Sequence, residues 1–131
     1  MAVSGVLIDT NIYSLAMRGD PEIVRTLQAI SHIGFSVISA GELLSGFKGG
    51  SREADNRSEL NRFLDSPRVV LYPVDTDTAD FYAEILDGLR QQGTPIPTND
   101  IWIAASAFQY GLRIFTRDRH FKKVAGLVHI P

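Results

Sequence analysis

Short apolar runs separated by helix-like segments are the feature that most constrains the fold of this chain. The runs lie at residues 3–8, 35–38, 69–72, 112–115 and 127–130. The segments between them carry helix-start residues and apolar residues at helical spacing. Strands that alternate with helices predict a mainly parallel sheet with helices on both faces. We therefore expect a three-layer α/β/α fold with a mainly parallel central sheet of about five short strands.

Local signals place the helices. Asp20 followed by Pro21 is typical of a helix start, and Gly34 is expected to end that helix. Ser39 and Glu42 have the spacing of a capping box. Further helices are expected at residues 52–65, after Asp75 or Asp77, and from a capping Thr98 to Gly111.

Length and composition narrow the class of protein. With 131 residues, of which 44% are hydrophobic and 21% charged, the chain is expected to form one domain over residues 1–131. The absence of cysteine excludes thiol nucleophiles and zinc ribbons. A formal charge of −2 argues against a histone-like nucleic-acid binder. No apolar run approaches a membrane span, and the start lacks a basic leader, so we expect a cytoplasmic protein with no membrane partner.

Four acids stand at related places in the predicted sheet. Asp9 ends the first run, Glu42 follows the second, Asp118 follows the fourth, and Asp100 opens the helix before the fourth. Ligands of open α/β sheets bind beyond the carboxyl ends of the strands. We therefore expect these carboxylates to converge at one edge of the sheet.

A divalent cation would explain such a cluster, because close carboxylates oppose each other's ionisation. Mg²⁺ takes carboxylate and phosphate oxygens and supports hydrolysis by a metal-activated water. Each acid also has an ordinary explanation. Asp9 suits a turn or a cap, Glu42 a capping box, Asp100 a helix N-terminus and Asp118 a solvated loop.

Four segments together resemble the PIN-domain family, and specifically its bacterial and archaeal VapC-type toxins. The resemblance implies an Mg²⁺- or Mn²⁺-dependent endoribonuclease that cleaves RNA, forms a homodimer and is blocked by a cognate antitoxin protein. The segments are Val6-Leu7-Ile8-Asp9-Thr10-Asn11, Ser39-Ala40-Gly41-Glu42-Leu43, Asn99-Asp100-Ile101-Trp102-Ile103-Ala104-Ala105 and Phe115-Thr116-Arg117-Asp118-Arg119-His120-Phe121.

The resemblance also assigns roles to the acids. Asp9, Glu42 and Asp100 match the three core metal-site acids of the family, and Asp118 matches a more variable fourth acid. All four are therefore candidate catalytic and metal-binding residues.

Two neighbouring residues also match the family, and a third departs from it. Thr116 corresponds to a hydroxyl that supports the acids by hydrogen bonding, and Asn11 to a polar residue beside the first acid. Their ordinary explanations are a turn residue and a helix cap. His120 is a departure, since many relatives carry another acid there, and we interpret it as a partly exposed loop residue.

Positive and apolar side chains suggest the partner surfaces. Binding of an RNA backbone requires cations near the acids. The candidates are Arg117, Arg119, Lys122 and Lys123, with Arg18 a weaker one. In the resembled toxins, the region 47–64 helps form a groove for an antitoxin segment. Its apolar residues are equally explained by core packing, and they are Phe47, Leu60, Phe63 and Leu64.

Other functions stay open. A metal-dependent phosphatase or DNA nuclease would use the same acids, and a chain without metal could be a non-catalytic RNA- or antitoxin-binding module. A signalling receiver domain fits poorly. That domain needs adjacent acids after its first strand, where this chain has Thr10 after Asp9, and an acid after its third, where Tyr72 and Pro73 stand.

Overall fold

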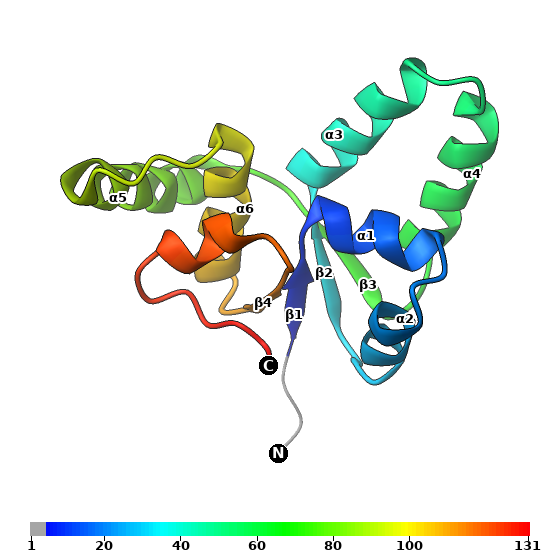
Figure 1. Ribbon diagram of the computed structural model, residues 1–131, viewed down its shortest axis with the longest axis horizontal. Helices are drawn as coiled ribbons and strands as arrows, with labels where there is room; N and C mark the ends of the chain where they lie inside the picture. The colour runs from blue at the N-terminus through cyan, green and yellow to red at the C-terminus, as the bar shows by residue number, and fades with distance from the viewer. Residues whose placement is uncertain (1–4) are drawn as a thin grey trace.

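The computed structural model describes residues 5–131 and has a parallel sheet of four strands between two layers of helices (Figure 1). The order of strands is β3-β2-β1-β4, with every pair parallel, as the alternating sequence pattern predicted. The strands are β1 (Val6–Ile8), β2 (Ile33–Ser36), β3 (Val69–Tyr72) and β4 (Arg113–Phe115). The start of the first predicted strand, residues 3–4, lies outside the described residues.

Two groups of helices cover the sheet. In Figure 1, the first four lie on the right of the sheet and the others on the left. The first group is α1 (Thr10–Met17), α2 (Pro21–Gln28), α3 (Val37–Lys48) and α4 (Glu53–Leu64). The second group is α5 (Thr76–Gln92), α6 (Thr98–Gln109) and the short 3₁₀ helix η1 (Arg119–Lys123). None of these helices has the length and apolarity needed to cross a membrane.

The prediction of a fifth strand at 127–130 was wrong. Within the described chain, this segment pairs with β4 through a single parallel bridge between His129 and Ile114. Two backbone hydrogen bonds hold it, from Ile114 N to the carbonyl of Val128 at 2.8 Å and from Ile130 N to the carbonyl of Ile114 at 3.0 Å. The segment follows a turn at Gly126, where φ is 80°, and only its last residues reach β4.

The prediction that Gly34 ends a helix was also wrong, because Gly34 lies inside β2. A Cβ atom at this position would lie 2.9 Å from side-chain atoms of both Leu112 and Tyr72. The glycine therefore lets these side chains pack directly on the strand. The helix ends earlier, at Gln28.

Two helix starts differ from the sequence prediction. Ser36 caps α3 by accepting a hydrogen bond from Ile38 N, so Ser39 and Glu42 do not form a capping box. Thr98 is the first residue of α6, and Pro97 occupies the cap position without a side-chain hydrogen bond. The predicted starts at Asp20 and Asp75 are confirmed, since both side chains accept backbone hydrogen bonds there.

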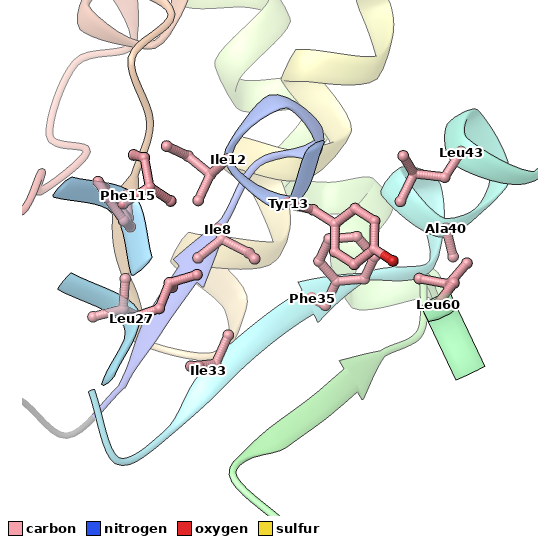
Figure 2. Close-up of a cluster of buried hydrophobic side chains, with 12 residues drawn as sticks. Ile8, Ile12, Tyr13, Leu27, Ile33, Phe35, Ala40, Leu43, Leu60 and Phe115 are labelled. Carbon is pink, nitrogen blue, oxygen red and sulfur yellow. The ribbon is translucent and has the colours of Figure 1, made fainter. Parts of the chain in front are cut away.

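The core consists of two hydrophobic clusters, one on each face of the sheet. Val6 and Ile8 point into the cluster beneath α1–α4, and Leu7 points into the cluster beneath α6 and η1. Figure 2 shows the first cluster, in which Tyr13 and Phe35 lie side by side. Because β1 is buried on both faces, it forms a rigid base for the residue that follows it, Asp9.

Candidate functional site

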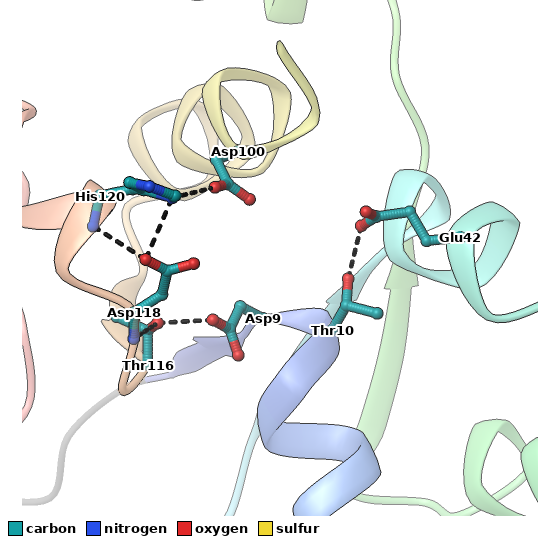
Figure 3. Close-up of polar contacts among 7 residues, drawn as sticks. All are labelled: Asp9, Thr10, Glu42, Asp100, Thr116, Asp118 and His120. Carbon is teal, nitrogen blue, oxygen red and sulfur yellow. Dashed lines mark hydrogen bonds and ion pairs between the residues drawn. The ribbon is translucent and has the colours of Figure 1, made fainter. Parts of the chain in front are cut away.

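The carboxyl ends of the strands bring the four predicted acids to one side of the sheet (Figure 3). Ile8 pairs with Phe115, so Asp9 and Thr116 follow adjacent strands at the same level. Glu42, Asp100 and Asp118 line a pocket of about 390 Å³, and Asp9 is linked to Asp118 through Thr116. The pocket is lined by Asn11, Glu42, Pro97, Thr98, Asn99, Asp100, Asp118 and His120.

Asp9 is buried at the base of this site, with 3% of its surface exposed. Its Oδ1 accepts a hydrogen bond from Ile12 N at 2.9 Å, which makes Asp9 the cap of α1. Burial raises the pKa of Asp9 above its ordinary value, although hydrogen bonds from Thr116 and Ile12 partly oppose this. The residue is thus both a helix cap and a buried carboxylate whose ionised form would gain from a nearby cation.

Thr116 connects Asp9 to Asp118. Its hydroxyl donates to Asp9 Oδ2 at 2.5 Å and accepts from Asp118 N at 2.9 Å. These two bonds fix the Asp9 carboxylate and the backbone of the loop after β4. Asn11, in contrast, is exposed and lines the pocket, and no hydrogen bond joins its side chain to the acids within the described residues.

The structure excludes the capping-box explanation for Glu42. It lies more than one turn into α3, beyond the first turn where a capping role would place it. Its Oε1 instead accepts a hydrogen bond from the Thr10 hydroxyl at 2.7 Å, and Ser39 Oγ lies 2.9 Å from the same hydroxyl. Glu42 is therefore held across the pocket from the other acids (Figure 3).

Asp100 lies in the first turn of α6, where a negative charge complements the helix dipole. Burial raises the pKa of Asp100, a hydrogen bond with His120 opposes the rise, and the charge of Asp118 adds to it. The charge of Glu42 also raises the pKa of Asp100 and the pKa of Asp9. The acids therefore interact electrostatically as one cluster.

His120 lies beside these acids and its side chain is 41% exposed, so the interpretation as a partly exposed residue holds, but its contact with the acids was not predicted. Its Nδ1 lies 3.2 Å from Asp100 Oδ2 and 3.1 Å from Asp118 Oδ1. Asp118 also accepts a hydrogen bond from His120 N at 2.9 Å and so caps η1. The Asp-X-His spacing, in which an aspartate caps a helical turn that carries a histidine, is the sequence signal that identifies this pair.

The donor set fits a divalent cation. Asp100, Asp118 and His120 each offer a ligand atom, and these atoms lie within 4.8 Å of one another. Carboxylates partly withdrawn from water repel each other, and a bound cation removes that repulsion. The residues present could therefore hold such an ion.

The predicted RNA-binding cations lie in the loop after β4 and on η1, and they differ in their contacts. Arg117 forms ion pairs with Asp20 at 3.2 Å and Glu22 at 3.4 Å, at the start of α2. It lines a second small pocket with Arg18 and Asp118. The other predicted cations are exposed on η1, and they are Arg119, Lys122 and Lys123.

A larger groove of about 830 Å³ lies between α1, α3 and α4. Of the four apolar residues predicted for partner binding, Phe47 lines this groove, whereas Leu60 is a core residue with 1% exposure. Phe63 and Leu64 also pack against the core. The residues that line the groove are Tyr13, Ser14, Met17, Arg18, Leu43, Phe47, Arg52, Asp55, Asn56, Ser58, Glu59 and Arg62.

Tyr13 is the unusual residue of this groove, because its hydroxyl is buried and has no hydrogen-bond partner within the described residues. Burial raises the pKa of Tyr13 to about 12. A buried hydroxyl that finds no partner within the described residues lowers the stability of the folded state.

Comparison with known proteins decides the family. The sequence profile of the PIN domain matches residues 6–127. The chain belongs to the PIN domain family. Ribonuclease VapC1 of Rickettsia felis is 32% identical over 129 residues, covering 94% of this chain and 92% of that protein.

Solved PIN proteins show the same fold. VapBC2 from Rickettsia felis, bound to a DNA fragment from its promoter, has a TM-score of 0.87 at 25% identity, covering 96% of this chain and 97% of that chain. DNA-bound VapBC from Salmonella typhimurium has a TM-score of 0.86 at 26% identity, covering 99% and 98%. The four-stranded parallel sheet of this chain is thus a PIN sheet.

Proposed function

We propose that this PIN protein is a metal-dependent endoribonuclease and the toxin of a toxin–antitoxin pair. The observation that carries the proposal is the convergence of Asp9, Glu42, Asp100 and Asp118 from four separate segments at the carboxyl edge of the sheet. The similarity to Ribonuclease VapC1 supports RNA as the substrate. The similarity to VapBC complexes supports a protein antitoxin as the partner.

Asp100 and Asp118 would hold the cation, with Asp9 and Glu42 facing it from the base and the far wall. When bound, Mg²⁺ or Mn²⁺ lowers the pKa of a coordinated water and neutralises charge on the phosphate oxygens. Thr116 keeps the Asp9 carboxylate in place by its hydrogen bond at 2.5 Å. Thr10 does the same for Glu42 at 2.7 Å. The two threonines are therefore positioning residues.

The RNA backbone would approach over the exposed cations of η1. Arg119, Lys122 and Lys123 lie one, four and five residues after Asp118, so they add positive charge to η1, the element that carries His120 of the acidic pocket. Arg117 adds to this surface while it remains paired with Asp20. A single strand or loop fits this arrangement better than a duplex, since the reacting phosphate must enter a recessed pocket.

The test is cleavage of RNA by the purified protein in Mg²⁺ or Mn²⁺, with single-stranded DNA and a phosphate monoester as comparison substrates. We expect RNA cleavage that excess chelator abolishes. The Asp100→Asn variant should lose cleavage while its circular dichroism is unchanged. Asp80→Asn, a substitution of an exposed acid on α5, is the matched control and should retain activity. Cleavage in chelator, or full activity of Asp100→Asn, would refute the proposal.

The antitoxin is proposed to dock in the groove between α1, α3 and α4. Phe47 and Tyr13 offer it an apolar wall, and Arg62 and Glu59 offer charged positions. Co-expression with the protein encoded beside this chain should yield a complex that no longer cleaves RNA. The homodimer implied by the PIN resemblance is tested on the same sample by analytical ultracentrifugation.

A further inference from the structure

His120 places a nitrogen atom among the carboxylates of the acidic pocket. Its Nδ1 lies 3.2 Å from an oxygen of Asp100 and 3.1 Å from an oxygen of Asp118, and these two acids come from α6 and from the loop after β4. The ring is half-exposed, with 41% of the side-chain surface accessible, so one face remains open to the pocket. Asp100, Asp118 and His120 therefore each place a potential ligand atom within 4.8 Å of the other two.

The spacing of these atoms matches a metal coordination shell. In octahedral coordination with bonds of about 2.1 Å, neighbouring ligand atoms lie about 3.0 Å apart. The distances of 3.2 Å and 3.1 Å are close to that edge length. All three ligand atoms lie within 4.8 Å of one another, so a cation bound by all three would require the two carboxylates to close toward it.

The local structure holds the imidazole in this position. His120 N donates to Asp118 Oδ1 at 2.9 Å, which ties the histidine and the aspartate into one turn. The next residue, Phe121, is fully buried in the cluster beneath α6 and anchors η1 to the core. With Phe121 directed inward, the neighbouring His120 side chain is directed toward Asp100 (Figure 3).

We propose that His120 Nδ1 is a ligand of the divalent cation in this site, together with Asp100 and Asp118. This inference rests on the proposed metal-dependent function and deepens it by specifying the ion. An imidazole nitrogen favours first-row transition ions over Mg²⁺, which prefers an all-oxygen shell. The site should therefore bind Mn²⁺ more tightly than Mg²⁺, and His120 should account for much of the difference.

The experiment is pulsed electron paramagnetic resonance of the full chain loaded with Mn²⁺, read as ¹⁴N modulation of the electron spin echo. The variants are His120→Ala and, as a matched control, His129→Ala, which removes a half-buried histidine from the C-terminal segment. We expect ¹⁴N modulation in the wild type and in His129→Ala, and its loss in His120→Ala. By calorimetry, His120→Ala should weaken Mn²⁺ binding by about tenfold or more. Binding of Mg²⁺ should change much less.

The outcomes separate this inference from the proposed function. Bound Mn²⁺ without ¹⁴N modulation in the wild type, or modulation that persists in His120→Ala, would overturn the role of His120 alone. Equal weakening of Mg²⁺ and Mn²⁺ binding would overturn the claimed ion preference. RNA cleavage by the same preparations is measured in parallel, so that loss of the proposed function is seen independently. A matching melting temperature for both variants and the wild type verifies that each is folded.

Discussion

The acidic pocket and the α1–α3–α4 groove are built in opposite ways. In the pocket, Asp9, Thr116 and Asp118 are linked to one another by hydrogen bonds, and the side chains come from separate segments of the chain. In the groove, the lining residues continue directly into the hydrophobic core, as Tyr13 and Leu43 do. A change in the pocket should therefore alter chemistry with little effect on stability, whereas a change beneath the groove should alter stability and binding together.

The largest effect is expected for Asp9→Asn. Asparagine is also a good helix cap, so α1 should persist, but the amide replaces a carboxylate at the base of the metal site. We expect RNA cleavage to fall by about 100-fold or more. The melting temperature should be unchanged or raised, because the substitution removes a buried charge. A single-turnover cleavage assay and a thermal melt check both parts, and a variant that unfolds would break the proposed contrast between the two regions.

Leu60→Ala tests the core beneath the α1–α3–α4 groove. Leu60 is 1% exposed beneath the groove, so its truncation should lower the free energy of unfolding by about 2–5 kcal/mol. Antitoxin binding should weaken with it. The control is Leu71→Ala at the 42% exposed position in β3, where we expect a change within about 0.5 kcal/mol. Urea denaturation measures both, and equal effects at the two leucines would contradict the assignment of Leu60 to the core.

Thr116→Val tests the hydrogen bonds inside the pocket. Valine keeps the shape of the side chain but removes the hydroxyl that joins Asp9 to Asp118 N. Cleavage should fall by about 10–100-fold, with weaker metal binding. Thr116→Ser retains the hydroxyl and should restore most of the activity. If serine and valine gave the same loss, the methyl group rather than the hydroxyl would be the important part of Thr116.

Tyr13→Phe sharpens the comparison at the groove. Because the hydroxyl of Tyr13 is buried and has no partner within residues 5–131, its removal should stabilise the free protein by about 1–3 kcal/mol. The same change should leave the affinity of the antitoxin complex nearly unchanged, because the hydroxyl is buried away from the groove surface. Denaturation of the free chain and calorimetry of the complex measure the two effects, and a destabilised free chain would show that the hydroxyl has a partner.

The smallest effect is the pH dependence of stability that Asp9 confers on the metal-free protein. A raised pKa in the folded state means that folding favours the protonated acid. The penalty of burying Asp9 is therefore absent below the ordinary value of 3.8, grows as pH rises toward the folded-state pKa, and is complete above it. The stability gained by Asp9→Asn should accordingly be present at neutral pH, shrink as the pH falls through the raised folded-state pKa of Asp9, and be absent below about pH 4. A gain that grew in acid would mean that the pKa is lowered.

Local sequence patterns were sufficient for much of the fold. The run Val69–Tyr72 forms β3 at the predicted positions, because a β-branched stretch is bounded by turn residues on both sides. Helix α1 was missed, because no helix was predicted after Asp9 although a cap was among its ordinary explanations. Gly34 was misinterpreted because a glycine is needed there for tertiary packing. The side chains of Leu112 and Tyr72 pack against β2 at this position.

The sequence predicted which acids come together in the candidate site, but it did not predict the contacts that hold them there. The placement of acids after strands identified Asp9 and Glu42, yet the Thr10 hydroxyl that holds Glu42 follows from the meeting of α1 and α3. His120 was undervalued because nothing in its immediate sequence indicates that Asp100, twenty residues earlier, lies beside it. A groove is lined in part by the predicted region 47–64, whereas its use by an antitoxin stays a prediction, and which of the apolar residues face outward depends on how α4 packs.

Anomalous scattering from crystals soaked in Mn²⁺ tests the central claim most directly. We predict a single strong peak between Asp100 and Asp118, with carboxylate oxygens about 2.0–2.3 Å from the ion. A peak elsewhere on the molecule, or none at this pocket in a crystal that cleaves RNA when dissolved, would contradict the account.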